Sequence, residues 1–476
     1  MAKIKRALTA MLLLSGCAVG PDFQKPAMPA PSTYTQDALP TGSQTLKPGD
    51  DIPADWWALF HAPALDALTR QALENNTDLQ SANAALRVAM EGLKAGQGLF
   101  YPTVGLGLNA SRNKDSATLS PVPASSALFY NLYQAQLSVS WSPDLWGGTR
   151  RQVEALQAQA DAQRYQLAAT HLAVVANVAA GAIQEASLRE QIAATQAIIA
   201  DAQAILNIAE RQQALGQIAG SDVAAQRVLL AQAQAALPPL EKQLAIQRDA
   251  LKALVGKLPA QDLAQTFRLA DLTLPRDLPV SLPSRLVAQR PDIRMAEENL
   301  HAASAAIGVA TANMLPNLTL TADSGSVASN LGHLLGPGTV LWNLGAGVAQ
   351  PVFDGGALRH REKAAEAAYD VAAAQYRGTV IAAFQNVADT LQTIAADDRT
   401  ERAAQLAETE SARALVLARQ QLELGQVDRT VLLLAQQAHQ QAVIALIQAR
   451  ASRLADSAAL FQALGGGWWN KDAQVQ

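Results

Sequence analysis

Catalysis requires nucleophiles, acids, bases or metal ligands at suitable spacings, and this 476-residue chain offers few of them. It contains no Gly-rich phosphate-binding loop, no His-Glu-x-x-His motif and no Cys-x-x-Cys pair. The six histidines are scattered, with no pair at metal-ligand spacing: His61, His171, His301, His333, His360 and His439. Asp397 and Asp398 stand in a charged run with Arg399 and Arg402, which is typical of a solvated helix face. The sequence therefore predicts a protein that is not an enzyme and that uses no metal or cofactor.

The only cysteine, Cys17, follows a segment with the layout of a secretory signal peptide. Basic residues precede an apolar run over 7–14, which is too short to span a bilayer, since spanning needs about 20 residues. The run ends in Leu-Ser-Gly-Cys, which resembles the lipobox of bacterial lipoproteins, in which the cysteine is lipidated and becomes the new N-terminus. We expect a signal peptide over 1–16 and a lipidated Cys17; the alternative is a stray thiol beside an ordinary cleavage site. Ala18 favours sorting to the outer membrane, because lipoproteins kept in the inner membrane often carry aspartate there.

The amino-acid composition and net charge exclude further classes of function. Hydrophobic residues make up 49% of the chain, but many are alanine, and only 16% of residues are charged. The net charge of −4 becomes −7 when the first sixteen residues, with three basic and no acidic side chains, are removed. Because phosphate binding needs a basic face, nucleic acid is excluded as a partner. No other segment has 18 uninterrupted apolar residues, so we expect no transmembrane helix.

An internal repeat organises the chain, with a period of about 210 residues, far above the periods of solenoid proteins. Four landmarks recur in the same order: 100–102 with 314–316, 143–148 with 351–356, 211–217 with 419–426, and 254–256 with 464–466. The sequence therefore predicts a duplicated unit of helix, β-hairpin, very long helix and returning helix.

The helices of each unit are predicted from their glycine and proline content. Residues 149–214 and 357–423 contain no proline and one glycine each, so each forms a helix about 100 Å long. Leu188, Ile192, Ile199 and Leu206 are spaced by four and seven residues, as in coiled-coil packing. Helices of this length belong to a rod or a tube and do not fit a compact globule.

Shorter helices complete each unit. The long helices end at Gly216 and Gly425, and Asp222 and Asp428 are placed to cap the returning helices. The shorter helices are expected at about 65–99, 222–255, 284–313 and 429–463. Pro238 and Pro239 are expected to interrupt the first returning helix.

Between the helices, the hydrophobic period changes to two. Residues 133–142 alternate apolar and polar side chains, and shorter alternations occur near 104–109, 317–321 and 342–348. Runs of about 10 residues with one apolar face suit tilted transmembrane strands, and aromatic residues gather beside them. Two half-buried hairpins packed on a helical domain would give the same pattern. If the strands do cross lipid, they must share a barrel with other copies, because an open sheet edge cannot exist there. Two copies would give about eight strands and a filled interior, so a conducting pore favours three or more.

At this point the sequence resembles the TolC-like outer-membrane factor family, in its lipoprotein branch of the OprM and NodT type. The resemblance covers nearly the whole mature chain. It is carried by these motifs: residues 19–23 with Pro26, 55–57 with Phe60, 73–79, and 290–294 with 296–297 and 307–308. The family's fold implies a mainly α-helical chain with a small β part, assembled as a homotrimer with an α-helical barrel and a shared 12-stranded transmembrane β-barrel.

The resemblance also implies a function and a division of the chain. The expected protein is the exit duct of a tripartite efflux pump, with a periplasmic adaptor and an inner-membrane pump, commonly of the RND class, as partners. The expected segments are a signal peptide (1–16), a lipidated tail (17–64), a first efflux repeat (65–256, strands about 103–112 and 131–142), a linker (257–283), a second efflux repeat (284–466, strands about 317–326 and 339–350) and a C-terminal tail (467–476). Two alternatives remain: the duct of a type I secretion system, and a periplasmic coiled-coil lipoprotein.

The gate of such a duct is expected at its periplasmic tip, where each long helix turns. In a trimer, three copies of Asp222 and of Asp428 would surround one axis and create a focused negative field. Arg429 is a candidate ion-pair partner that holds the closed state. Helix capping alone would also explain both aspartates. The chain has leucines at 422 and 433–434, where relatives often carry a tyrosine and an aspartate, so its gate residues differ from theirs.

Overall fold

The structure is a computed structural model, which describes residues 18–27, 33–36, 42–114 and 129–470. Cys17 and the signal peptide lie outside these residues. The chain forms two compact units, and four of the five boundaries between them fall within helices. Of the described residues, the first unit contains 18–26, 87–114, 129–162 and 296–376, and the second contains 27, 33–36, 42–86, 163–295 and 377–470.

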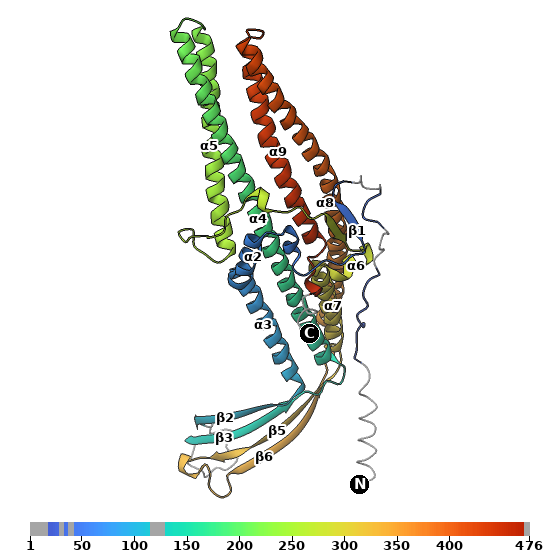
Figure 1. The fold of residues 1–476 in the computed structure, drawn as a ribbon. Helices are drawn as coiled ribbons and strands as arrows, with labels where there is room; N and C mark the ends of the chain where they lie inside the picture. The colour runs from blue at the N-terminus through green and yellow to red at the C-terminus, as the bar shows by residue number, and fades with distance from the viewer. Residues whose placement is uncertain (1–17, 28–32, 37–41, 115–128, 471–476) are drawn as a thin grey trace. The chain divides into compact units, whose positions relative to one another are not determined.

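The first unit is built around one antiparallel sheet of four strands (Figure 1). The strands are β2 (Thr103–Lys114), β3 (Phe129–Trp141), β5 (Asn317–Ala328) and β6 (Val340–Ala349), in the order β2-β3-β5-β6. Leu106 lies opposite Leu137, Leu137 opposite Ser324, and Ala322 opposite Leu344. The two hairpins of the repeat thus join into one sheet through β3 and β5.

The second unit contains most of two long antiparallel hairpins of helices, whose long helices begin in the first unit (Figure 1). The first hairpin pairs α4 (Gly148–Ala214) with α5 (Gly220–Leu254), and the second pairs α8 (Ala357–Glu423) with α9 (Arg429–Ala463). Both long helices have 67 residues and both returning helices have 35. The duplicated, mainly helical fold with a small sheet confirms the predicted fold class.

The helices that precede each β-hairpin differ from the prediction, because each is divided in two. The first is α2 (Pro63–Asn75) and α3 (Thr77–Gln97), and the second is α6 (Pro283–Gln289) and α7 (Pro291–Ala312). The dividing residues, Asn76 and Arg290, both have extended backbones. Arg290 precedes a proline, which disfavours the helical conformation, and the Asn76 side chain accepts the N–H groups of Asp78 and Leu79 at the start of α3.

Both dividing residues also cap a returning helix. Asn76 Nδ2 donates to the carbonyl of Leu254 at the end of α5, over 2.9 Å. Arg290 Nη1 donates to the carbonyl of Ala463 at the end of α9, over 2.7 Å. The last carbonyls of a helix lack partners within it, so these two bonds satisfy groups that would otherwise be buried without one. The two repeats perform the same task with different residues.

The prediction that Pro238 and Pro239 interrupt the first returning helix was wrong. Helix α5 continues through both prolines. Both side chains are exposed, so water can reach the carbonyl groups that lose their helical N–H partners. Leu229, Leu230 and Ala233 are buried before the prolines, and Leu251 is buried after them. Packing on both sides holds the helix together across the defect.

Two short N-terminal segments are fixed against the helices. In the first unit, Arg151 donates to the carbonyl of Val19 and pairs with Asp22 at 2.6 Å, and the ring of Phe23 stacks on His301 at 4.4 Å. In the second unit, β1 (Thr45–Pro48) pairs in parallel with β4 (Asp277–Val280). The N-terminal segment therefore contributes to both units.

Two helices, α4 and α9, contain an 18-residue stretch that is apolar enough to cross a membrane by length and composition alone. Alanine raises the hydropathy of these stretches without adding long apolar side chains, and helices that pack against neighbours have similar compositions. The test therefore gives weak support for a membrane helix.

Candidate functional site: the two-faced sheet and the hairpin tips

The sheet of the first unit has one apolar face. Its apolar side chains are unusually exposed, with Leu106 at 73% and Leu108 at 75%. The others on strands of the sheet include Val104, Phe129, Leu137, Trp141, Val340, Trp342, Leu344 and Val348. Such an apolar surface, with aromatic residues on it, is typical of strands that face lipid.

The outer strands leave the sheet open. In the part of the chain that the structure describes, β2 pairs only with β3, and β6 pairs only with β5. Each outer strand therefore presents a row of backbone N–H and C=O groups that need partners. In hydrocarbon these groups must be hydrogen-bonded, so the sheet is one part of a larger closed structure.

The opposite face of the sheet is polar. On β3 it carries Gln134, Gln136 and Ser138, and on β5 it carries Thr321 and Asp323. Gln136 Nε2 donates to Asp323 Oδ1 over 2.7 Å. Gln134 in turn donates to Gln136. This hydrogen-bonded row lies on the face that would line water in a closed barrel.

The hairpin tips lie at the turns between the long and returning helices. Gly216 and Gly425 both have positive φ angles, 72° and 68°, which glycine adopts without strain. Asp428 is the N-cap of α9, as predicted, and its carboxylate accepts the N–H of Val431 over 3.2 Å. The expectation that Asp222 caps α5 was wrong, because Ala219 is the N-cap and Asp222 lies within the first turn. Within α5, Asp222 is therefore placed to interact favourably with the positive end of the helix dipole.

Arg429 is bonded within the chain, and its expected role as an ion-pair partner in the closed state stays a prediction. Among the residues that the structure describes, it forms no ion pair with Asp222 or Asp428; its guanidinium donates to the Gln212 side chain. Gln212 lies near the end of α4, so this bond joins the two hairpins of one chain close to their tips. Further along, Arg419 and Asp201 approach to 3.6 Å between α8 and α4. Both contacts hold the second hairpin against the first.

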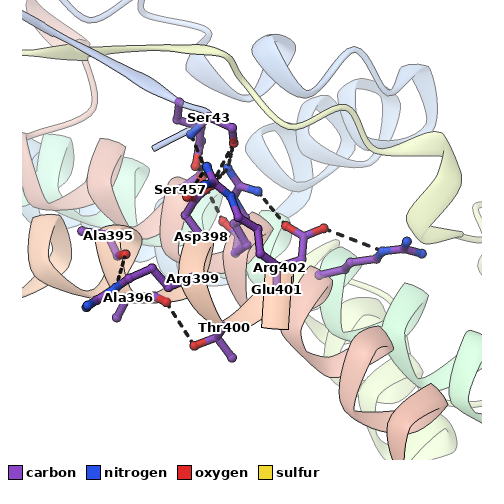
Figure 2. A network of polar contacts seen from close by, with 12 residues as sticks. Ser43, Ala395, Ala396, Asp398, Arg399, Thr400, Glu401, Arg402 and Ser457 are labelled. Carbon is purple, nitrogen blue, oxygen red and sulfur yellow. Dashed lines mark hydrogen bonds and ion pairs between the residues drawn. The ribbon is translucent and has the colours of Figure 1, made fainter. Parts of the chain in front are cut away.

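A buried ionic network contradicts the prediction of a solvated face at Asp397 and Asp398 (Figure 2). Asp398 is buried, and it pairs with Arg402 at 2.7 Å and with Arg453 at 2.9 Å. Arg453 also pairs with Glu401 at 2.7 Å. The backbone N–H and hydroxyl of Ser43 both donate to Asp398. The network therefore attaches the N-terminal segment before β1 to α8 and α9.

Asp397 lies beside this network without an arginine bonded to it. Burial, together with the neighbouring carboxylate of Asp456, raises its pKa from 3.8 to about 7. Its Oδ2 atom is buried without a hydrogen-bond partner in the part of the chain that the structure describes. The Asp397 carboxyl is therefore neutral over a wider pH range than an exposed aspartate. Sequence reasoning missed this pair because Asp456 is far from Asp397 along the chain.

Metal chemistry has no support in the described residues. They contain no group of three or more His, Cys, Asp and Glu side chains placed to hold an ion. His301 is engaged otherwise, since it stacks on Phe23 and lies 2.9 Å from Glu154. The polar groups of this chain instead join helices to one another and line one face of the sheet.

The comparisons with known proteins agree with this geometry. The family model of outer membrane efflux proteins matches residues 68–257 and 282–466. The pyoverdine export outer membrane protein OpmQ of Pseudomonas putida is 35% identical and aligns over 90% of this chain and 92% of its own length. The toluene efflux pump outer membrane protein TtgC of Pseudomonas putida is 29% identical, over 98% and 96%.

Solved structures give the same result. The outer-membrane channel OprN superposes with a TM-score of 0.86 at 26% identity, covering 95% of this chain and all of that one. The outer membrane protein VceC of Vibrio cholerae superposes with a TM-score of 0.81 at 25% identity, covering 88% of this chain and all of that one. The chain belongs to the outer membrane efflux protein family, the TolC-like outer-membrane factors.

Membership of this family establishes the function of the chain. It is the outer-membrane channel of a tripartite efflux pump, and it acts as an exit duct rather than as an enzyme. It resides in the outer membrane and extends into the periplasm, where the other components of the pump meet it.

Proposed function

We propose that three copies of the chain assemble into one duct, in which each copy contributes four strands to a barrel of about twelve. The observation that carries this proposal is the sheet itself, which has an exposed apolar face and two open edges, β2 and β6. Because strand directions alternate, β6 of one copy can pair antiparallel with β2 of the next. A dimer would close about eight strands, whose interior is filled by side chains. Three copies leave a conducting lumen.

The division of the chain into an N-terminal tail (17–64), two repeats (65–256 and 284–466), a linker (257–283) and a C-terminal tail (467–476) is part of this proposal. The two segments matched by the family model support it, because they begin and end within a few residues of these limits. The equal lengths of the paired helices also support it.

Cys17 is proposed as the lipid-bearing residue, after removal of residues 1–16. Support comes from the residues that follow it. Val19 donates its backbone N–H to the carbonyl of Trp146 over 2.9 Å, just beyond the end of β3, and Arg151 holds Asp22. A lipid on Cys17 would therefore be attached two residues before Val19, which is hydrogen-bonded to the first unit.

The gate is proposed at the hairpin tips, with Asp222, Asp428 and Arg429 as the residues that set it. Three copies of each aspartate around one axis would repel one another and favour opening. The bond from Arg429 to Gln212 would oppose that movement, because it holds the second hairpin against the first. The balance between these two effects sets the resting state.

The partners are proposed to be a periplasmic adaptor and an inner-membrane pump of the RND class, and the cargo to be drugs or other small toxic compounds. The names of the relatives support a role in which the cargo is chosen elsewhere, since they mention pyoverdine, an antibiotic and toluene. A duct that accepts such different compounds leaves selection to its pump. Type I secretion would use the same duct with a different inner-membrane partner.

The test is single-channel conductance of the detergent-purified protein in planar bilayers, with its oligomeric mass measured in parallel. Wild-type protein is compared with an Asp222→Ala, Asp428→Ala double variant, with Arg429→Ala, and with Asp249→Ala as a control on α5 outside the tip. We expect a trimer that is mostly closed, and larger or more frequent openings in the double variant and in Arg429→Ala.

The outcomes separate the parts of the proposal. Equal conductance in all four proteins would keep the duct and remove these residues from the gate. A trimer that inserts and never conducts would overturn the conducting assembly. A mass other than three chains would overturn the stoichiometry.

A further inference from the structure

One ionisable group stands on the polar face of the sheet. Among the residues of β2, β3, β5 and β6, Asp323 is the only acidic one. The two basic residues, Arg112 and Lys114, alternate onto the same face as Leu106 and Leu108, and Lys114 lies over the ring of Phe129. Whatever charge this part of the wall presents to water therefore comes from Asp323.

The carboxylate is held in position by its neighbours. Gln136 donates to it over 2.7 Å, and Gln136 is itself held by the donor of Gln134. Ser138 lies directly opposite Asp323 in the register of β3 and β5. A carboxylate that accepts hydrogen bonds from fixed donors keeps its charge and its direction.

The glycines of the outer strands β2 and β6 leave the carboxylate of Asp323 accessible. The polar face of β2 carries Gly105 and Gly107, and that of β6 carries Gly345 and Gly347. A Cβ atom added at Gly105 or Gly347 would meet nothing within 4 Å. The row across the sheet at Asp323 runs through Gly105, Ser138 and Asn343, so no larger side chain shares it.

We propose that Asp323 is a selectivity residue of the duct, and that its copies form a ring of carboxylates in the outer-membrane part of the lumen. This inference rests on the trimeric duct proposed above. Where β6 of one copy meets β2 of the next, the two glycine-bearing strands become neighbours. Near the level of Asp323 each junction then carries the glycines of β2 and β6, and each pair of strands β3 and β5 carries one carboxylate. The ring attracts cations, including cationic compounds in transit, and repels anions.

The effect depends on salt in a predictable way. Rings of acidic side chains favour cations in other channels, because they raise the local cation concentration. Charges on the wall of a wide lumen are screened over about 10 Å at 0.1 M salt and about 3 Å at 1 M. The contribution of Asp323 is therefore substantial in dilute salt and small in concentrated salt.

The experiment measures the reversal potential of purified oligomers in planar bilayers under a KCl gradient, in dilute and in concentrated salt. Asp323→Asn removes the charge and keeps an acceptor for Gln136. We expect the K⁺ to Cl⁻ permeability ratio of this variant to fall by about twofold in dilute salt, with little change at 1 M. Asp249→Asn, on the exposed surface of α5, is the matched control and should behave as wild type.

A second variant separates charge from structure. Thr321 lies two residues before Asp323 on the same face and is exposed. Adding Thr321→Asp to Asp323→Asn returns one carboxylate to this face, and the permeability ratio should recover. If the oligomers conduct but the ratio is unchanged by Asp323→Asn, or is not recovered by the double variant, the selectivity assignment is wrong and the duct stands. If wild-type oligomers do not conduct, both the duct and the ring are overturned.

Discussion

The two helical hairpins of the second unit have the same lengths but different interiors. Near its tip, the first hairpin buries a cluster of Ala202, Leu206, Ala209, Val223 and Leu230, whereas the second buries only Leu415, Ala418 and Leu432. Burial of apolar area is the main source of packing free energy, so the first hairpin is held more firmly within one chain. We therefore expect the second hairpin to move more readily at its tip than the first.

The buried charged residues of the two hairpins also differ. The first hairpin buries one carboxylate, Glu185, which accepts from both Arg189 and Arg248. The second collects four carboxylates, Asp397, Asp398, Glu401 and Asp456, around Arg453, and only some of them are paired. The buried carboxylate of the first repeat is therefore paired with two arginines, whereas Asp397 in the second repeat forms no ion pair with an arginine among the described residues. We expect the response to pH and to loss of a single arginine to be concentrated in the second hairpin.

The largest expected effect is the loss of Arg453. Arg453→Met leaves Asp398 and Glu401 without their shared partner in a buried position, so the free energy of unfolding should fall by about 3–5 kcal/mol. Arg248→Met in the first hairpin is the matched change, and it should have a smaller effect because Arg248 pairs with one carboxylate, Glu185, whereas Arg453 pairs with two. Denaturant titration of the detergent-purified variants measures both. Equal losses would remove the electrostatic difference between the repeats.

Substitutions at the two dividing residues, Asn76 and Arg290, should lower the free energy of unfolding by smaller and more similar amounts. Arg290→Ala leaves the carbonyl of Ala463 without its side-chain donor and removes the ion pair with Asp292, and should lower the free energy of unfolding by about 2 kcal/mol. Asn76→Ala removes one bond to Leu254 and the N-cap of α3, and should lower it by about 1–2 kcal/mol. Hydrogen exchange at the ends of α5 and α9 localises each loss. A global loss without local exposure would contradict the capping role.

The pH dependence should come from Asp397. Because its pKa in the folded protein is raised from 3.8 to about 7, its contribution to stability is complete below about pH 4 and is lost as the pH rises through about 7. In Asp397→Asn this contribution no longer titrates, so the variant should gain stability relative to wild type between these pH values. Melting curves from pH 4.5 to 8 measure the difference, with Asp249→Asn as the control. Parallel curves for Asp397→Asn and wild type would show that the pKa of Asp397 is not raised in the folded protein.

The smallest effects are expected at the tip aspartates. Asp428→Ala removes the bond to Val431 and should expose the first turn of α9 to hydrogen exchange, a local loss of about 1 kcal/mol. Asp222→Ala removes only an interaction with the helix dipole, so α5 should lose about 0.5 kcal/mol. If the two losses are equal, Asp222 contributes more than its position in the first turn explains.

Much of the fold could be predicted because its signals are local. The absence of proline and the near absence of glycine predicted the long helices, and α8 begins and ends at the predicted residues, while α4 begins one residue earlier. The alternation of apolar and polar residues predicted the strands. Both signals repeat along the chain, and the second copy of each supported the first.

The errors arose where a distant partner decides the structure. Asn76 and Arg290 break their helices and bond to carbonyls at the ends of α5 and α9, which the local sequence does not reveal. Asp398 belongs to a charged run, yet Arg453 and Ser43 bury it from other parts of the chain. Asp222 is a good capping residue, but Gly220 and Ser221 join the helix before it. Local sequence propensity predicted the helices and strands. Bonds between residues far apart in the sequence determine where helices break and which charges are buried.

Helices α4 and α8 have equal lengths, as do α5 and α9, and this constrains which insertions the helices can accept. Inserting one residue into α4 would advance everything beyond it by about 1.5 Å and rotate it by about 100°, while α8 stayed as before. The first tip would then no longer meet its partner, and Gln212 would turn away from Arg429. Inherited insertions in these helices should therefore survive as compensated sets that recur in both repeats and in the returning helices, most readily as multiples of seven residues, which also restore the facing side chains.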